Sequence, residues 1–147
     1  QGIVEDDMMD IDLAYAISKH AHRHQRRKEL GEDSLPLRYF EHPKRVAWIL
    51  IDEAKVYDPT VICTALLHDG IEDTRIITYP KLRHWLGRDV ANNVKALTKD
   101  PKYPHRYLEN LKNTDWRVLI VKAAELLTGL IIFARLVLAR QSFRQSK

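Results

Sequence analysis

The sequence predicts an all-α fold in a single domain over residues 1–147. A chain of 147 residues has the size of one ordinary domain and can bury one core. Apolar residues make up 45% and charged residues 30%, which is typical of a globular protein and excludes disordered and collagen-like classes. Apolar residues recur at helical spacing in nearly every segment, and no Asn-Gly or Asp-Gly pair joins two alternating runs.

The first predicted helix covers about residues 10–30 and ends at Gly31. Its apolar stripe consists of Ile11, Ala14, Ile17 and Ala21. We expect residues 1–9 to form a flexible acidic tail, because the start of the chain is rich in acids and lacks bases, the reverse of a signal peptide. Glycine, serine and proline within residues 31–41 predict a loop.

Each later helix is predicted from its own start and stop signals. The remaining helices begin near Pro43 and Pro59, span residues 80–86, 88–98 and 105–113, and close with a long helix after Asp115. Proline suits a first helical turn, and the aspartates before Pro59 and Trp116 suit N-caps. Gly87 separates two of the short helices. The tryptophans Trp48, Trp85 and Trp116 are expected in the core.

The long final helix is apolar enough to require a comparison with a membrane span. Residues 118–139 could reach across a bilayer. However, Lys122, Glu125 and Arg135 lie within them, and each would cost roughly 2.5–3.5 kcal/mol near the bilayer centre. The sequence therefore favours a buried core helix, with no membrane partner.

Charge and cysteine content narrow the partners and the compartment. The net charge of +4 is mild, so it suits an anionic ligand and makes a nucleic-acid partner unlikely in our interpretation. The single cysteine, Cys63, excludes an internal disulfide framework, and a reducing, cytoplasmic location fits. A homo-oligomer is compatible with the sequence.

Four ionisable side chains follow an apolar helix within six positions: His68, Asp69, Glu72 and Asp73. An imidazole beside a carboxylate offers one nitrogen and one oxygen ligand, a combination that suits Mn²⁺, Fe or Zn²⁺ better than Ca²⁺. Glu72 and Asp73 could then hold or deprotonate a water. The alternative is a solvated helix end with a capping histidine.

Two further side chains could complete such a site. His42 directly precedes Pro43 at the start of the second helix and is either a surface histidine or a third ligand. Glu125 is an acid in an apolar helix, and Lys122 stands three residues before it. Glu125 is therefore either the partner of Lys122 or a fourth ligand.

Other clusters of polar residues are interpreted as solvated surface. His20, His22 and His24 alternate along the first predicted helix, and no acid or cysteine completes a zinc site with them. A basic run follows at residues 23–28, and most such runs are solvated.

Taken together, the motifs resemble those of HD-domain phosphohydrolases. They are most similar to the hydrolase domain of the Rel/Spo alarmone enzymes and to small stand-alone alarmone hydrolases. The resemblance covers about residues 13–125. The motifs are Ala21-His22-Arg-x-Gln25-x-Arg27-Lys28, His42-Pro, Leu-Leu-His68-Asp69-Gly-Ile-Glu72-Asp73-Thr74, Leu97-Thr98-Lys99 and Asp115-x-Arg117-Val-Leu-Ile-x-Lys122.

The resemblance implies a fold, a reaction and a set of roles. It implies a helical HD-domain fold and metal-dependent removal of pyrophosphate from the 3′ position of guanosine 3′,5′-bis(diphosphate) or its triphosphate analogue. The residues match the family's positions as follows: His42, His68 and Asp69 match metal ligands, usually for Mn²⁺; Glu72 and Asp73 match the acids that position and activate water; Arg27, Lys28 and Tyr39 match nucleotide-pocket residues.

The chain departs from the family pattern in the last motif. The family continues Asp-Arg-x-His-Asn from its last ligand, whereas this chain has Glu125-Leu-Leu-Thr-Gly129. Extra residues also stand between Lys28 and Tyr39. Two explanations remain: an active hydrolase with an altered nucleotide preference, or a catalytically lapsed HD module that binds a nucleotide or a partner as a regulatory domain.

Overall fold

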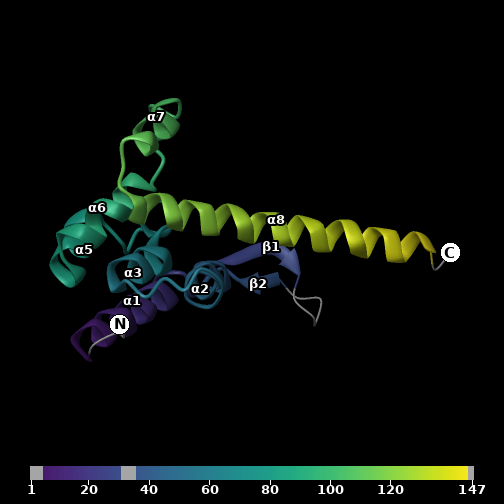
Figure 1. The fold of residues 1–147 in the computed structure, drawn as a ribbon, viewed down its shortest axis with the longest axis horizontal. Coiled ribbons are helices and arrows are strands. Elements are labelled where there is room, and N and C mark those ends of the chain that lie inside the picture. The colour runs from purple at the N-terminus through teal and green to yellow at the C-terminus, as the bar shows by residue number, and fades with distance from the viewer. Residues whose placement is uncertain (1–4, 31–35, 146–147) are drawn as a thin grey trace.

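The structure is a computed structural model that describes residues 5–30 and 36–145. Its elements in chain order are α1 (Glu5–Ala21), β1 (Arg26–Leu30), β2 (Pro36–Arg38), α2 (Glu41–Trp48), the π-helical turn η1 (Ile49–Glu53), α3 (Pro59–Leu67), α4 (Gly70–Asp73), α5 (Tyr79–Leu86), α6 (Arg88–Ala96), α7 (Arg106–Lys112) and α8 (Trp116–Gln145). The all-α prediction is confirmed, with one small hairpin added to it (Figure 1).

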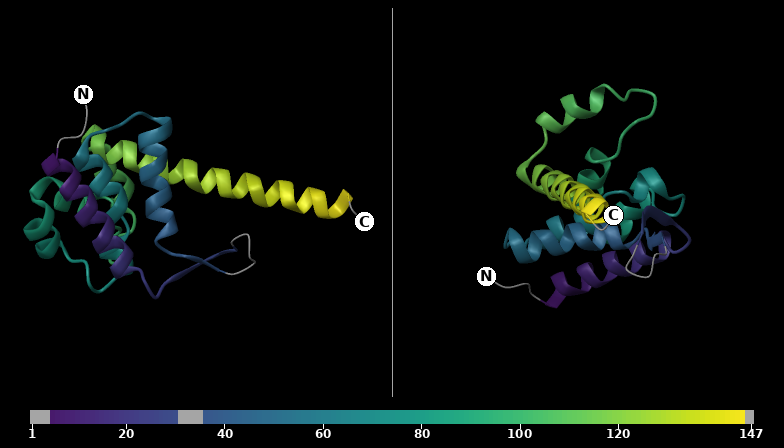
Figure 2. Two further views of the ribbon diagram at one scale, coloured as in Figure 1. Left: turned by 90° about the horizontal axis from the view of Figure 1, so that it is seen from below. Right: turned by 90° about the vertical axis from the view of Figure 1, so that its right-hand side faces the viewer.

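The central helix is α3, against which α1, α2, α6 and α8 pack (Figures 1 and 2). The Asp58 carboxylate begins it by accepting the backbone N–H of Thr60 at 2.9 Å, as the sequence predicts. All residues from Val61 to Leu67 are buried, so this helix is apolar on every side. The packing of the core around α3 therefore fixes the position of its C-terminal end and of the ionisable residues that follow it, beginning with His68 and Asp69.

The first helix differs from its prediction at both ends. It begins at Glu5, so residues 5–9 are helical instead of part of an acidic tail; residues 1–4 and the expected stop at Gly31 lie outside the described residues. It ends at Ala21 instead of Leu30, and β1 pairs antiparallel with β2, Arg26 opposite Arg38. Residues 23–29 are mostly charged and give a helix no apolar face to bury, so they form the hairpin instead.

The later helices follow their predictions closely, and Gly87 is the junction of α5 and α6. It has a φ of 90°, a conformation that favours glycine. Asp115 caps α8 by accepting the N–H of Arg117 at 2.9 Å.

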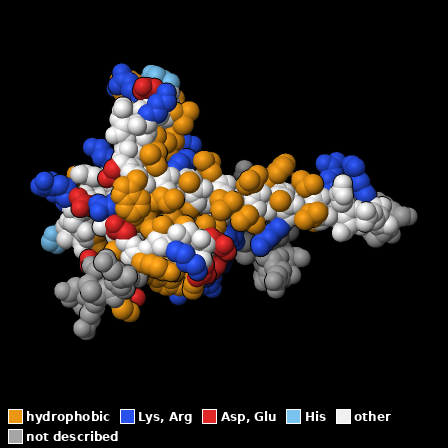
Figure 3. Space-filling model, viewed as in Figure 1, with side chains coloured by type: hydrophobic (Ala, Val, Ile, Leu, Met, Phe, Trp, Pro, Cys, Tyr) orange, Lys and Arg blue, Asp and Glu red, His pale blue; other side chains and the backbone are white. Residues whose placement is uncertain are grey.

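The prediction of a buried core helix for α8 holds only in its first half. Val118, Val121, Ala124 and Thr128 are buried against the body. Beyond them the helix projects away from the other elements, and its apolar side chains are exposed (Figures 1 and 3). No helix of the described residues is long and apolar enough to cross a membrane. The core prediction for the tryptophans is wrong for Trp48 and Trp116, which are 54% and 55% exposed.

Candidate active site

His68 stands at the end of α3 with its ring fully enclosed. Its Nδ1 lies 2.6 Å from the carbonyl oxygen of Ala65, and because a carbonyl only accepts, Nδ1 must carry a proton. The second nitrogen, Nε2, lies 3.1 Å from Oδ2 of Asp69, in a direction that leaves it without a hydrogen bond among the described residues. The backbone thus orients His68 so that Nε2 faces Asp69.

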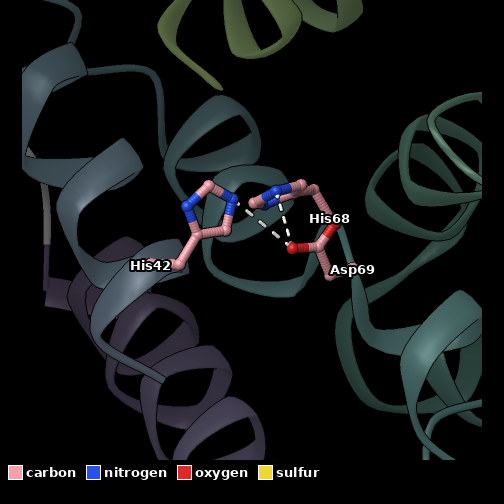
Figure 4. A group of neighbouring side chains, drawn as sticks. All are labelled: His42, His68 and Asp69. Carbon is pink, nitrogen blue, oxygen red and sulfur yellow. Dashed lines mark ion pairs between the residues drawn. The ribbon is translucent and has the colours of Figure 1, made fainter. Parts of the chain in front are cut away.

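His42 reaches the same point from the first turn of α2. Its Nε2 lies 3.5 Å from Oδ2 of Asp69, and the rings of His42 and His68 are 5.2 Å apart. The donor atoms of His42, His68 and Asp69 all lie within 4.8 Å of one another (Figure 4). The structure therefore brings together two segments that are 26 residues apart in the chain.

The protonation states of the three residues fit a cation site. Burial, followed by the neighbouring His68, lowers the pKa of His42 to about 3, so this imidazole is neutral. Burial opposes charge on both His68 and Asp69, but their mutual interaction raises the pKa of His68 and lowers that of Asp69 to about 2. Two imidazoles, a carboxylate and a buried Nε2 without a hydrogen bond fit a divalent metal ion, which would take the place of the His68 proton.

Tyr39 connects Asp69 with Asp73. Its hydroxyl donates to Oδ2 of Asp73 and lies 3.3 Å from Oδ2 of Asp69. Nε2 of Gln25 donates to the backbone carbonyl of Asp73 at 2.5 Å. Glu72, one residue earlier, is exposed; desolvation at the site, followed by the charges of Asp73 and Asp69, raises its pKa.

His22 belongs to this site, although the sequence analysis assigned it to a solvated face. It is 1% exposed, stacks on Tyr39 with ring centroids 4.7 Å apart, and makes a 2.6 Å hydrogen bond from Nδ1 to Gln25. The error follows from extending the first helix to residue 30. The motif that contains both His22 and Gln25 was the one signal that could have identified it.

An open cavity of about 540 Å³ is bordered by two members of the candidate metal-ligand cluster, which consists of His42, His68 and Asp69. The cavity is lined by Arg27, Tyr39, His42, Asp69, Glu125, Leu126, Gly129 and Leu130. The Arg27 guanidinium stands 5.6 Å from the Tyr39 ring centroid and supplies positive charge at the mouth. Lys28 lies in β1, but its side chain is outside the described residues. Arg27 and Tyr39 therefore both line this cavity, and their role in binding a nucleotide stays a prediction.

Glu125 lines this cavity and also pairs with Lys122. Its Oε2 accepts from Nζ of Lys122 at 3.2 Å. The Tyr107 ring lies 5.4 Å from each of Nζ of Lys122 and Nζ of Lys99. Glu125 therefore shares the cavity with the candidate metal-ligand cluster, but a lysine holds its carboxylate and it is not one of the three grouped residues.

Comparisons with known proteins agree on one family. No protein-family model matches the chain. The guanosine-3′,5′-bis(diphosphate) 3′-pyrophosphohydrolase MESH1 of Xenopus tropicalis is 36% identical over 114 residues, which are 74% of this chain and 61% of that protein. The bifunctional (p)ppGpp synthase/hydrolase SpoT of Escherichia coli K12 is 33% identical over 132 residues, 82% of this chain and 18% of that protein.

A solved structure supports the same conclusion. It is described as "A metazoan ortholog of SpoT hydrolyzes ppGpp and plays a role in starvation responses", has a TM-score of 0.72 and 30% identity, and is matched over 82% of this chain and 68% of its own. The chain belongs to the HD-type alarmone hydrolase family. It spans about three fifths of the length of the MESH1 relative.

Within the alarmone hydrolase family, the departures of this chain now have a location. Leu126 and Gly129 stand where the family pattern has Arg and Asn, and both line the cavity. Thr128 stands where the pattern has His, and its hydroxyl is turned back to the Ala124 carbonyl at 3.0 Å. The α8 wall of the cavity is therefore apolar where a family member offers hydrogen-bond donors.

Proposed function

We propose that the chain is a metal-dependent nucleotide pyrophosphohydrolase that removes the 3′-pyrophosphate from guanosine 3′,5′-bis(diphosphate). The observation that carries this proposal is the grouping of His42, His68 and Asp69 beside a second carboxylate, Asp73, which Tyr39 holds in place. His42, His68 and Asp69 would hold the cation, for which we propose Mn²⁺. Such an ion lowers the pKa of a bound water and neutralises phosphoryl charge.

The remaining residues would position and deprotonate the attacking water. Glu72 and Asp73 lie on α4 directly after Asp69, and two observations support this role: the charge of Asp69 acts on Glu72, and the Tyr39 hydroxyl contacts both Asp69 and Asp73. The raised pKa of Glu72 suits a general base better than an ordinary carboxylate does. Water adds to the phosphorus on the 3′ oxygen, that P–O bond breaks, pyrophosphate leaves and the ribose 3′-hydroxyl takes a proton.

Arg27, Lys28 and Tyr39 would bind the nucleotide. Arg27 provides charge for phosphate groups at the cavity mouth, and the Tyr39 ring forms part of the cavity wall. Lys28 is included from the family motif alone. Glu125 would act as a fourth metal ligand if it leaves Lys122.

The test is pyrophosphate release from guanosine 3′,5′-bis(diphosphate) by the purified chain, with Mn²⁺ and with a chelator. We expect turnover that requires Mn²⁺ and is lost in His68→Ala, whereas His84→Ala, a change at an exposed histidine on α5, keeps it. Metal-independent turnover, or equal turnover in both variants, would contradict the proposal.

A catalytically lapsed binding module is the second candidate. The apolar α8 wall at Leu126 and Gly129 and the Lys122–Glu125 ion pair favour it. It predicts that calorimetry detects nucleotide binding while no pyrophosphate appears at saturating Mn²⁺. Substrate affinity and turnover measured on the same preparation therefore separate the two.

Four expectations from the sequence stay predictions. These are a single domain over residues 1–147, a cytoplasmic location, the lack of a nucleic-acid partner and self-association. Limited proteolysis tests the single domain, cell fractionation tests the location, and titration with nucleic acid tests the lack of such a partner.

A further inference from the structure

Exposed apolar residues lie around much of the projecting half of α8, and one row of apolar residues along the helix has coiled-coil spacing. Seven of them stand alternately three and four positions apart, the a and d spacing of a heptad repeat. This α8 stripe consists of Trp116, Leu119, Ala123, Leu126, Leu130, Phe133 and Val137. All seven are exposed, and the six large ones are between 44% and 64% exposed.

The α8 stripe is separate from the face that holds α8 on the body. That face consists of buried Val118, Val121, Ala124 and Thr128. The stripe continues from the packed half of the helix into the projecting half, over about 30 Å at 1.5 Å per residue. Figures 1 and 2 show the projecting half extending past the other elements, and Figure 3 shows hydrophobic side chains along it. A continuous apolar surface of this kind marks an interaction site.

We propose that a second copy of this chain covers the α8 stripe, with the two α8 helices packed antiparallel. An a/d stripe is self-complementary under two-fold symmetry, so the same seven side chains serve both copies. This interface goes beyond the proposed function and does not depend on it.

The charges on α8 select the antiparallel direction. Arg135, Arg140 and Arg144 follow the apolar run, and no Asp or Glu follows Glu125. Arg140 occupies the d position after Phe133, so in a parallel pair it would face the same arginine of the other copy.

An antiparallel pair removes this repulsion. If Leu119 of one copy lies opposite Val137 of the other, the a positions of each helix face the d positions of its partner, and Arg140 reaches Trp116 at the end of the stripe. It then lies beside Asp115 of the partner subunit, an acid at the helix start. Leu126 and Leu130 belong both to the stripe and to the cavity lining, so the partner helix would border the active-site cavity.

The first test is the mass of the whole chain by sedimentation equilibrium across a range of micromolar concentrations. We expect a dimer, and Phe133→Glu should convert it to a monomer with unchanged helical content by circular dichroism. Leu138→Glu is the matched control, because Leu138 is 66% exposed on the same helix but outside the stripe. A monomeric parent, or dissociation by both changes alike, would overturn the proposal.

The second test fixes the direction. Chains with Leu119→Cys and chains with Val137→Cys are mixed under mild oxidation, with the buried Cys63 left in place. A disulfide between the two variants is expected. Disulfides formed only within each variant would show a parallel pair. Binding of a monomeric chain to phosphatidylcholine vesicles would assign the stripe to a lipid surface, and either result would overturn the proposal.

Discussion

At the scale of single residues, the site depends on the tautomer of His68. The Ala65 carbonyl holds a proton on Nδ1, so Nε2 is directed at Asp69 and is the atom that we propose binds the metal. The sequence contains no signal for this contact, because the acceptor is a main-chain carbonyl that every residue has. A main-chain atom one helical turn away thus sets the chemistry of the ring.

His68→Ala should abolish stoichiometric Mn²⁺ binding, because it removes the most buried of the three ligands. Isothermal titration calorimetry of the metal alone checks this, independently of any turnover. His20→Ala changes an exposed histidine of α1 and is the control. If the His68 variant binds Mn²⁺ as tightly as the parent, the ligand assignment is wrong.

Glu72→Gln should lower turnover by roughly 10²-fold or more, the scale of general acid–base catalysis. The melting temperature should change little, since the Glu72 side chain is exposed. Steady-state kinetics and thermal denaturation give the two numbers. Normal turnover, or an unfolded variant, would argue against a catalytic role.

The pH dependence should report the same carboxyl group. A base must be deprotonated, and the pKa of Glu72 is raised by desolvation and by Asp73. As pH falls, activity should therefore begin to decline at a higher pH than an ordinary glutamate would give. A pH–rate profile of the parent checks this prediction; the residual activity of Glu72→Gln should lack that acidic limb.

At the scale of elements, the break between α3 and α4 places the acids. Gly70 is buried at this break, and a Cβ there would lie 2.6 Å from Cδ1 and 3.0 Å from Cγ2 of Ile77. Ile77 is itself buried and β-branched, so it has little room to move. Close packing of the following loop thus orients Glu72 and Asp73.

Gly70→Ala should destabilise the protein by about 1–3 kcal/mol, the usual result of overpacking a core. Adding Ile77→Val removes the nearest methyl group and should recover part of the loss. Gly129→Ala is the control, because no described atom lies within 4 Å of its added Cβ. Urea denaturation measures all three, and equal stability of the parent and Gly70→Ala would contradict the packing argument.

The α8 element decides the role of Glu125. Glu125→Ala should weaken Mn²⁺ binding, whereas Lys122→Ala should change it little and leave the carboxylate available to the cation. Glu125→Asp should keep or raise turnover, because it restores the family's ligand. Mn²⁺ affinity and turnover across the three variants provide the measurement. If Glu125→Ala costs stability alone, the residue is a structural partner of Lys122.

At the scale of the whole molecule, two helices and a hairpin converge on one cavity. α2 brings His42, the turn after α3 brings Asp69, and β1 with the segment after β2 brings Arg27 and Tyr39. α8 closes the cavity on one side with Glu125 and then leaves the body. The same helix thus serves the site with its first half and presents the exposed apolar stripe along its length.

The sequence alone was enough to predict the helical fold class and most helix starts. These depend on local signals: Asp58 and Asp115 cap helices through bonds to their own neighbours. The His68-Asp69 block offers nitrogen and oxygen donors, but its type and spacing alone left a capping histidine as the alternative, and its proposed chemistry came from the resemblance to a family. The helix caps need no long-range contact, whereas the meeting of His42 with His68 and Asp69 does.

The tertiary structure alone decided which side chains leave solvent. From the sequence alone, His22 was assigned to a solvated face. In the structure the chain leaves α1 and forms the hairpin, and the Tyr39 ring, directly after β2, stacks on His22. Glu125 had two possible partners at the sequence level. The pair with Lys122 is local to the helix, whereas the packing of α8 on the body decided that Glu125 also lines the cavity. The apolar run after it predicted burial, yet no described element reaches the far half of α8. The hydrophobicity of a helix indicates which side chains are favourable to bury. Whether they are buried depends on which other elements pack against them.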